Sequence, residues 1–513
     1  MVTLRIRPTL DAEVIVVGAG PAGAATATCL ARAGVSTLLL DRQRFPRDKV
    51  CGDFVGPVAL VELQRLGITD QPAYRQSNVI YSAAVFLDGK RLITSPIPDV
   101  PGLPPYGRVI PRKALDAWIV AAARAAGAIV IEGVRARDFV EESDHVAITV
   151  EERGVTRTLR AHALVGADGS SSLIARVLRS FPAPDEDRII AVRAYFDGVA
   201  GPEDQADLYF SAESFPGYYW LFPTGPERAN VGVGMVLETF PRTEDHLREL
   251  LLNLIERDPG LQERLRDARM EGKVVGWPLT TYNPRLPIVG ERVLLVGDAA
   301  GLINALNGEG IQYALLSGRW AAETLIAARA AGDYSARALT PYAARVEREF
   351  RYDMALSGMI VQLIRNRSLN PLWMHALRII VNRARVDPRY ADATGGVLAG
   401  LVPASSVLSA HVIGGTIHQA VLTTGIDAIG HLVRGPQHLA GIGRDATRTA
   451  FQIAATTTRS PRKFTRWGMG VVRSGAELVL QASRHALGPA PAPEATLPHE
   501  QEARLTLRVS ADH

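Results

Sequence analysis

The first forty residues combine two continuous apolar runs with a glycine-rich turn between them. Residues 13–17 (EVIVV) have the unbroken apolar pattern of a parallel strand that is buried on both faces. The turn follows, and an alanine-rich stretch then predicts a helix through Ala33 that ends at Gly34. Residues 35–40 form a second apolar run, which ends at Asp41. This strand–helix–strand order predicts an α/β fold with a doubly wound sheet.

Later segments continue the same pattern. Residues 113–127 have the periodicity of an amphipathic helix, and residues 128–132 and 163–169 contain apolar runs that predict strands. Residues 292–298 predict another strand, which leads towards a long helix that starts near Gly310. We expect these segments to complete the doubly wound sheet.

A block of different character lies between these segments. Residues 183–282 contain alternating stretches, such as 189–196 and 230–235, which are typical of antiparallel strands. The pattern therefore predicts a doubly wound domain that is interrupted by a β-rich domain. A mainly helical extension is expected after residue 345.

The extension contains an uncharged stretch. Residues 393–426 are 34 consecutive positions without Asp, Glu, Lys or Arg. A membrane-spanning helix needs about 20 predominantly apolar residues, but this stretch also contains many Gly, Ser, Thr and His residues. We expect a buried helical element, with an element at a membrane interface and a true span as alternatives. The proline-rich segment 491–513 predicts a flexible tail.

Composition excludes several classes of protein. The 513 residues allow two or three domains, and 47% hydrophobic with 21% charged residues exclude a disordered chain, collagen and a coiled coil. Cys29 and Cys51 are the two cysteines and lie in different kinds of segment, so a disulfide framework is excluded and a reducing cytoplasm is expected. The first ten residues lack the apolar core of an export signal. His411 and His418 have no third ligand at a metal-binding spacing, so no metal site is expected.

Charge is concentrated near the C-terminus. Residues 431–490 hold nine Lys or Arg against Asp445 and Glu477, whereas the whole chain has a net charge of +4. A solvated basic face is one interpretation, and contact with anionic lipid or another protein is the other. Nucleic acid is not an expected partner, because no known nucleic-acid-binding motif accompanies the charge.

The glycine-rich turn indicates a dinucleotide site. Gly18-x-Gly20-x-x-Gly23 follows a predicted strand and opens a helix, so backbone N–H groups and the positive end of the helix dipole are available to a pyrophosphate. Asp41 ends the second strand 18 residues after Gly23, where a carboxylate can accept both ribose hydroxyls. Together these residues predict a bound dinucleotide.

Three distal motifs distinguish FAD from NAD. They are Ala167-Asp-Gly169, Gly297-Asp-Ala-Ala-Gly301 and Asn307-Gly-Glu-Gly310, and with the first motif they resemble FAD enzymes of the para-hydroxybenzoate-hydroxylase-like fold. The resemblance implies that Asp298 binds the ribityl hydroxyls, and that the helix after Gly308 points its N-terminus at the flavin N1 and C2 carbonyl. It also makes Arg112 a flavin contact, for which a solvated arginine at a helix start is the alternative. The expected cofactor-binding residues are Gly18, Gly20, Ala22, Gly23, Asp41, Arg42, Cys51, Gly52, Arg112, Asp168, Gly169, Gly297, Asp298, Gly308, Gly310 and Ile311.

A second nucleotide site is not expected. Gly232-Val-Gly234 lacks a third glycine and lies in a predicted strand, so the chain offers no separate fold for NAD(P)H. NAD(P)H that binds transiently at the flavin, or another electron donor, is therefore the expected reductant.

Two further segments narrow the family. Residues 45–53 (FPRDKVCGD) and 217–223 (GYYWLFP) with Asn230-Val-Gly232 resemble the geranylgeranyl reductase family of FAD-dependent oxidoreductases, over about residues 10–345. One departure is that Phe215 stands where archaeal members have a proline, which follows one residue later. The resemblance implies reduction of carbon–carbon double bonds in a prenyl lipid, quinone or prenyl diphosphate.

Chemistry suggests roles for three residues. An isolated alkene is a poor electrophile, so the faces of Tyr218 and Trp220 would stabilise positive charge that develops during its reduction. These aromatic residues would also line an apolar substrate tunnel, although packing residues of a strand have the same pattern. The resemblance places Cys51 near the flavin ring, and a structural thiol is the alternative.

The same motifs also occur in flavin monooxygenases, so hydroxylation or epoxidation of an aromatic or polyketide-like substrate is the alternative function. A non-catalytic FAD-binding protein is the alternative that is not an enzyme. The oligomeric state is not predicted. The expected organisation is a discontinuous Rossmann-like FAD-binding domain (10–70, 105–180 and 283–345), a substrate domain (71–104 and 181–282) and a helical C-terminal region (346–490).

Overall fold

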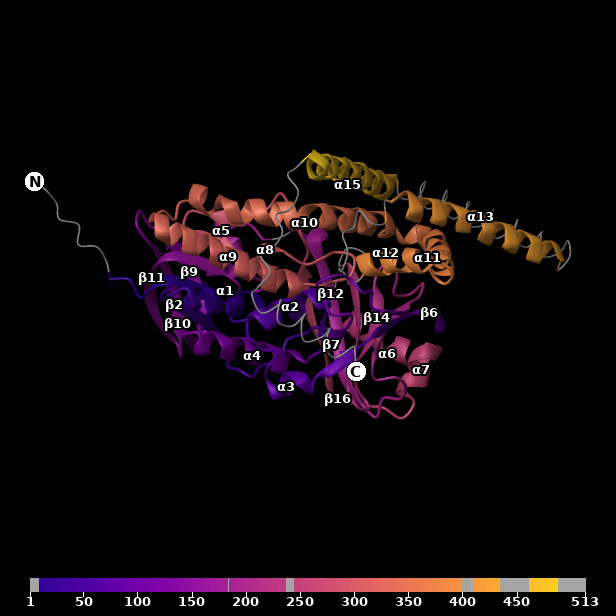
Figure 1. Ribbon diagram of the computed structural model, residues 1–513, viewed down its shortest axis with the longest axis horizontal. Helices are drawn as coiled ribbons and strands as arrows, with labels where there is room; N and C mark the ends of the chain where they lie inside the picture. The colour runs from indigo at the N-terminus through magenta and orange to yellow at the C-terminus, as the bar shows by residue number, and fades with distance from the viewer. Residues whose placement is uncertain are drawn as a thin grey trace, which may run out of the picture.

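The computed structural model describes residues 9–182, 184–236, 244–398, 407, 409–433 and 461–487. It is an α/β protein with two large sheets, and Figure 1 shows the C-terminal helices gathered along one side of them. The FAD-binding α/β class with a helical C-terminal region is therefore confirmed. The predicted tail at 491–513 and residues 434–460 and 488–490 of the basic segment lie outside the described residues.

The first sheet has eight strands, in the order β17-β18-β11-β1-β2-β8, with the β9–β10 hairpin paired to β11. β1 pairs in parallel with β11 on one side and with β2 on the other, which places the ends of all three strands at one edge. The apolar run of β1 is buried on both faces, as its sequence predicts. The strands are β1 Ala12–Val17, β2 Thr37–Asp41, β8 Ile129–Glu132, β9 Val134–Glu141, β10 Val146–Glu152, β11 Val155–Gly166, β17 Val289–Gly290 and β18 Val293–Leu295.

Helices cover this sheet, and α1 packs against both α4 and α9. Small residues allow the close approach of α1 and α9, because a Cβ at Gly318 would overlap the carbonyl oxygen of Ala22. Thr26 strengthens the contact by donating a 3.1 Å hydrogen bond to the Gly318 carbonyl oxygen. The helices of this part are α1 Pro21–Arg32, α2 Pro57–Arg65, α3 Pro72–Arg75, α4 Arg112–Ala125, α5 Leu173–Arg179, α8 Gly297–Ala300 and α9 Ile311–Ala331.

The second sheet has seven strands in the order β16-β12-β15-β14-β13-β5-β6. Its neighbours are antiparallel except β13 and β5, which pair in parallel. Tyr209 and Tyr219 stack on the face that also buries Leu247 and Leu251 of α6 (Glu244–Arg257), with α7 (Pro259–Leu265) following. The strands are β5 Ser82–Leu87, β6 Lys90–Pro96, β12 Arg188–Asp197, β13 Gln205–Phe210, β14 Tyr218–Gly225, β15 Arg228–Val236 and β16 Arg269–Thr280.

A small sheet connects the two parts. It contains β3 (Phe54–Val55), β7 (Gly107–Val109) and β4 (Asn78–Ile80) in that order. Ile80 and Val109 pack against Trp220 and Phe222 on the other face of the seven-stranded sheet. The loop that precedes Phe54 is therefore held between the two large sheets.

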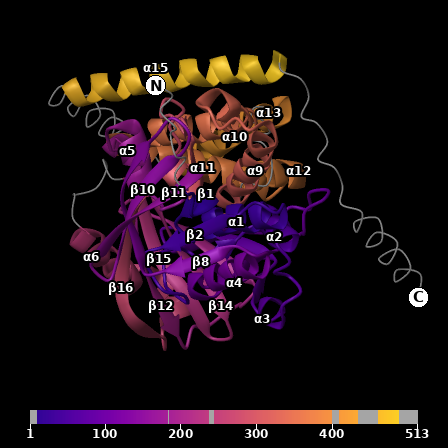
Figure 2. The same cartoon turned by 90° about the vertical axis from the view of Figure 1, so that its left-hand side faces the viewer.

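The C-terminal helices gather around α10 (Ala336–Ile364), which itself packs on α9 of the first part. The others are α11 (Asn370–Ala384), α12 (Pro388–Leu398), α13 (Ala410–Val433) and α15 (Pro461–Leu487). α15 packs on α10, and α13 packs on α11 and α12. Figure 2 shows α15 running along the outside of the group.

The uncharged stretch 393–426 differs from our expectation. Among the described helices none is long and apolar enough to cross a bilayer. The expected buried element is also wrong for the described part of α13, where Ile413, Ile417 and Val421 are 44%, 61% and 69% exposed. Only the opposite side of this helix, which includes Val412 and Gly415, is buried.

Candidate active site

Close packing explains two of the three glycines in the first turn. Gly18 has φ +102°, and a Cβ there would overlap the carbonyl oxygen of Ala167. A Cβ at Gly23 would overlap the carbonyl oxygen of Gly18. Gly20, the N-cap of α1, is different, because a Cβ there would meet only Arg47, at 3.8 Å. The open side of the turn thus lies over Gly20 and the α1 N-terminus.

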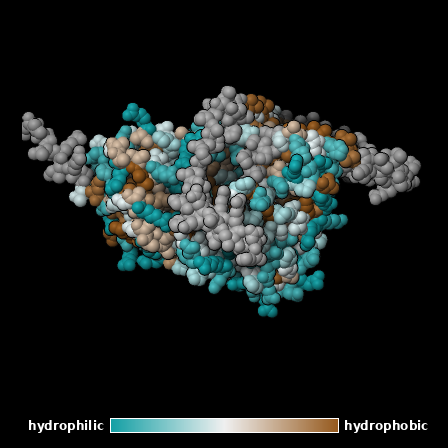
Figure 3. Space-filling model, viewed as in Figure 1, coloured by the Kyte–Doolittle hydropathy of each residue, from teal (hydrophilic) through white to brown (hydrophobic). Residues whose placement is uncertain are grey.

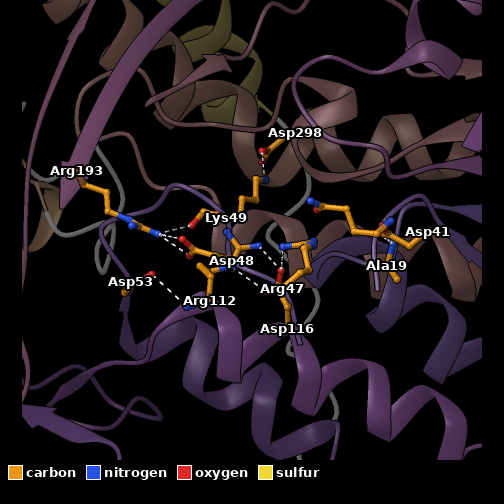
Figure 4. Close-up of polar contacts among 11 residues, drawn as sticks. Ala19, Asp41, Arg47, Asp48, Lys49, Asp53, Arg112, Asp116, Arg193 and Asp298 are labelled. Atoms are coloured by element: carbon orange, nitrogen blue, oxygen red, sulfur yellow. Dashed lines mark hydrogen bonds and ion pairs between the residues drawn. The ribbon is translucent and has the colours of Figure 1, made fainter. Parts of the chain in front are cut away.

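Asp41 lies beside this turn, as expected. Its carboxylate accepts hydrogen bonds from the backbone of Ala19 (2.8 Å) and Gln43 (2.7 Å), which fixes it at the end of β2 (Figure 4). The next residue, Arg42, is exposed, and its guanidinium lies 6.0 Å from the Trp277 ring centroid.

Two of the expected cofactor residues have packing roles in this structure. Ala22 is buried, and a Cβ added at Gly297 would lie 2.8 Å from its methyl group. Both residues therefore bring α1 and α8 close together. Gly297 has φ +55° and begins α8.

Arg112 is buried and paired, so the alternative of a solvated arginine is wrong. Its side chain is 4% exposed and makes two hydrogen bonds, of 2.8 and 2.9 Å, to the Asp116 carboxylate one turn later in α4. Arg47 approaches the same carboxylate at 2.6 Å. Figure 4 shows the two guanidiniums meeting at Asp116, which holds the loop around Arg47 against α4.

Asp298 of α8 contacts the same loop at Lys49. Lys49 approaches its carboxylate at 3.0 Å, and Ser170 at 3.4 Å. Burial alone would raise the pKa of Asp298, but the positive charges of Lys49 and Arg112 outweigh it and hold the pKa below its usual value. A Cβ at Gly310 would lie 3.4 Å from an Asp298 oxygen, so this anion borders the start of α9.

Asp53 is the centre of a network that sequence reasoning missed. It is fully buried with φ +65°, and its Oδ2 accepts hydrogen bonds from the Tyr195 hydroxyl (2.6 Å) and the Asn230 amide (2.8 Å). The backbone N–H of Arg112 lies 3.3 Å from Oδ1. Burial raises the pKa of Asp53 to about 6, although the bonds from Tyr195 and Asn230 oppose the rise.

A second contact joins the same loop to the seven-stranded sheet. Arg193 of β12 approaches both carboxylate oxygens of Asp48, at 2.5 and 2.6 Å. Figure 4 shows Arg193 reaching the loop from the side opposite to Asp41. The loop 47–53 is therefore held by ion pairs to both domains.

Cys51 and Gly52 lie where this loop meets β14. Cys51 is half-buried, and burial raises the pKa of its thiol although Arg112 opposes the rise. The thiol is therefore protonated at neutral pH. A Cβ at Gly52 would lie 3.1 Å from the Phe222 ring, so the glycine permits close contact with the aromatic face of β14.

That aromatic face consists of Tyr218, Trp220 and Phe222, with successive ring centroids 6.1 Å apart. Trp220 and Phe222 are buried in a packed cluster, and Trp220 donates a 2.9 Å hydrogen bond to the Asn230 side chain. Tyr218 is partly exposed, and its hydroxyl donates a 2.5 Å hydrogen bond to the Asn307 carbonyl oxygen. Of the two aromatic residues expected to be catalytic, Tyr218 is the more accessible.

Asp168 caps a helix. Its carboxylate accepts hydrogen bonds from the Ser172 hydroxyl (2.5 Å) and the Leu173 backbone (2.6 Å) at the start of α5. Gly169 has φ +81°, and a Cβ there would meet nothing within 4 Å. The Asp-Gly pair thus forms an open turn next to Ser170, which reaches Asp298.

The start of α9 is the second open helix N-terminus. Gly308 has φ +71°, and Gly310 is an N-cap without a side-chain hydrogen bond. Ile311, the first helical residue, is buried. The turn is closed by the Glu309 backbone N–H, which donates to the Asn307 side chain at 2.9 Å.

Glu309 also carries a carboxyl group that sequence reasoning did not use. Among the described residues, no side chain forms a hydrogen bond or ion pair with this carboxyl. Burial raises its pKa to about 8. A Cβ at Gly56 would lie 3.3 Å from its Oε1, which places the carboxyl beside the N-terminus of α2. The Gly-x-Gly spacing at 308–310 could have drawn attention to it.

The arrangement fits FAD. Two helices, α1 and α9, begin at glycines that have no side-chain cap. Two carboxylates lie near these helix starts: Asp41 at the end of β2, and Asp298 between α9 and Lys49. The first helix start suits a pyrophosphate and the second suits an electron-rich flavin edge, because both offer backbone N–H groups and a positive dipole end. Among the described residues no cluster of His, Cys, Asp and Glu could hold a metal ion.

Comparisons with known proteins agree with this reading. The FAD binding domain family matches residues 11–348. The chain is 33% identical over 337 residues to the menaquinone reductase of Mycolicibacterium smegmatis, which covers 63% of this chain and 78% of that protein. It is 32% identical over 372 residues to digeranylgeranylglycerophospholipid reductase 2 of Methanopyrus kandleri, with 71% and 90% covered.

Solved structures share the fold. A geranylgeranyl bacteriochlorophyll reductase-like protein from Thermoplasma acidophilum matches with a TM-score of 0.61 at 23% identity, over 80% of this chain and 96% of that chain. A flavin-dependent brominase matches with a TM-score of 0.63 at 18% identity, over 82% and 99%. The sequence relatives and the matched FAD domain show that the chain is an FAD-dependent oxidoreductase of the geranylgeranyl reductase family.

Proposed function

We propose that this enzyme reduces carbon–carbon double bonds of an isoprenoid molecule, which would be a prenyl lipid, a quinone or a prenyl diphosphate. One observation carries the proposal: the Cys51–Gly52 loop lies against the aromatic face of β14, next to the open start of α9. The relatives named as menaquinone and digeranylgeranylglycerophospholipid reductases support this substrate class, because both names describe molecules with prenyl chains.

Bound FAD would supply the reducing electrons. Gly18, Gly20 and the α1 N-terminus would hold its pyrophosphate, Asp41 its ribose, and Asp298 its ribityl chain. The protein must also deliver a proton to one alkene carbon and exclude water. We propose that the Glu309 carboxyl holds this proton, because burial raises its pKa to about 8 and its charge lies close enough to Tyr218 to raise the pKa of that hydroxyl.

The electron donor is proposed to be NAD(P)H acting transiently, or another donor. No second glycine-rich nucleotide motif follows a strand in the sequence. Oxidised enzyme titrated anaerobically with NADH and NADPH, with bleaching of the flavin absorbance as the readout, would identify a nicotinamide donor.

The substrate class can be tested directly. Enzyme reduced with dithionite under anaerobic conditions is incubated with prenyl diphosphates, menaquinones and aromatic polyketides, and the products are analysed by mass spectrometry. After any quinol has been reoxidised in air, the proposal predicts a product heavier by H₂ for each carbon–carbon double bond reduced. Products that gain oxygen, and form only when oxygen is admitted, would instead support a flavin monooxygenase. The fold shared with a flavin-dependent brominase is the observation that favours this second candidate.

We also propose that the enzyme works in the cytoplasm, peripherally at the inner face of the membrane. An isoprenoid lipid or quinone resides in a bilayer, and the basic C-terminal region would favour an anionic surface.

A further inference from the structure

The outward face of α15 combines exposed apolar side chains with arginines. Met469, Val472, Val479 and Leu480 are 63%, 73%, 66% and 45% exposed, although large apolar side chains are usually buried. The exposed positions recur every three or four residues, so they occupy one side of the helix. Arg462, Arg466 and Arg473 are exposed at positions of the same series.

Contacts on the inner side fix this orientation. Trp467 donates a 2.9 Å hydrogen bond to the Gln362 carbonyl oxygen of α10, and Glu477 pairs with Arg351 at 2.9 Å. A Cβ at Gly470 would overlap the Gln362 side chain, so the two helices are in close contact. Because these contacts anchor one side of α15 to the protein, the opposite side faces away from it.

The outward face has a uniform sign of charge. Between residues 462 and 481 the acidic side chain is Glu477, which is paired on the inner side. A partner with an apolar interior beneath a negatively charged surface would complement such a face. An apolar protein groove would instead leave the arginines without counter-charges.

α13 adds apolar surface on the same side of the molecule. Ile413, Ile417, Val421 and Leu422 are exposed on it. Figures 1 and 2 both place α13 and α15 along the upper edge of the molecule, and Figure 3 shows brown hydrophobic surface at that edge. Large apolar side chains that are exposed in groups, rather than singly, mark an interaction site.

We infer that the outward faces of α15 and α13 form a docking surface for an anionic phospholipid bilayer. The apolar side chains would enter the interfacial region while the three arginines meet lipid phosphates, as in helices that lie flat on a membrane. The inference deepens the proposed location at the membrane, on which it rests, by naming the surface that binds, and it needs no turnover and no bound substrate.

The test is co-sedimentation of the full-length FAD-loaded protein with vesicles. Vesicles of phosphatidylcholine with about 30% phosphatidylglycerol are compared with pure phosphatidylcholine, in low salt and in about 0.5 M salt. The expected result is binding to the anionic vesicles that weakens with salt. Two double variants then separate the contribution of the apolar side chains from that of the arginines. They are Val472→Glu with Val479→Glu, and Arg466→Ala with Arg473→Ala.

We expect the double glutamate variant to lose binding to the anionic vesicles. The double alanine variant should lose about fivefold in affinity for the anionic vesicles for each arginine removed. Matched controls are Val140→Glu with Val155→Glu, which are exposed on β9 and β11, and Arg75→Ala with Arg135→Ala. These should bind like the wild type. Circular dichroism and flavin content verify that each variant is folded.

Three outcomes would overturn the inference. The first is a wild type that fails to bind anionic vesicles, and the second is a glutamate variant that binds them as well as its control does. The third is a wild-type dimer in analytical ultracentrifugation that the glutamate variant converts to a monomer, because a second copy of the chain would then occupy the surface. Loss of reductase activity in a variant that still binds vesicles would bear on the proposed function alone.

Discussion

The side-chain amide of Asn230 donates a 2.7 Å hydrogen bond to the backbone carbonyl oxygen of Cys51. Asn230 belongs to β15 of the seven-stranded sheet, whereas Cys51 belongs to the loop that follows β2 of the other sheet. The same amide reaches Asp53, and the Asn230 oxygen accepts from Trp220. The seven-stranded sheet therefore holds the backbone at Cys51, in a loop that follows a strand of the other sheet.

Asp298→Ala should purify with much less flavin. The substitution removes the proposed ribityl acceptor and leaves Lys49 without its 3.0 Å partner, at a cost of about 1–3 kcal/mol. The ratio of flavin to protein absorbance measures the effect. Asp197→Ala, at an exposed position on β12, is the matched control and should retain its flavin. Full flavin content in Asp298→Ala would show that the ribityl site is elsewhere.

Cys51→Ser should bind FAD normally and turn over slowly. Asn230 of β15 holds the Cys51 backbone, and the next residue, Gly52, lies against the aromatic side of β14, so we expect the substitution to leave the pyrophosphate site unchanged. We expect a fall of about tenfold in kcat, which corresponds to about 1.4 kcal/mol in the transition state. Cys29→Ser, in the middle of α1, serves as the control. Unchanged turnover with a confirmed substrate would assign Cys51 a structural role.

Reduction of the substrate should slow above pH 8 in the wild type. Burial raises the pKa of Glu309 to about 8, and only the protonated carboxyl can donate a proton, so activity is lost as pH rises through this value. Glu309→Gln should be slow at every pH and lack this decline. The measurement is the single-turnover rate constant of substrate reduction by reduced enzyme, determined as a function of pH. A variant that keeps the wild-type pH profile would exclude Glu309 as the proton source.

Gly232→Ala should destabilise the protein by about 1–3 kcal/mol, because the added methyl group would overlap the Trp220 ring and the Val192 backbone. Gly234→Ala is a close control on the same strand, since its methyl group would lie 3.8 Å from the same ring. Urea unfolding midpoints compare the two variants. Equal midpoints would mean that the packing of Trp220 is looser than described.

The sequence predicted local features well. β1, the glycine-rich turn, α1 and β2 follow each other along the chain, so hydrophobic periodicity and turn chemistry were sufficient to place them. The start of α9 after Gly310 was predicted for the same reason. The cofactor roles of individual residues stay predictions.

Contacts across long sequence separations could not be predicted. Tyr195 and Asn230 meet Asp53 from 142 and 177 residues away, and no periodicity records such a meeting. Arg112 and Asp116 are different, because their spacing of four residues is typical of an ion pair on a helix, but this signal was missed and a solvated arginine stayed an alternative. The exposed stripe of α13 was missed because an uncharged run was interpreted through composition rather than through its position on the surface.

Within the described strands the chain crosses between the two large sheets four times, because β5–β6 and β12–β16 are inserted between strands of the first sheet. No single cut in the polypeptide therefore separates a complete cofactor domain from a complete substrate domain. A protease that nicks one crossing would leave a two-piece protein that still migrates as one particle. Neither large sheet is built from one contiguous stretch of the chain, so neither could be transferred to another protein as a single uninterrupted segment.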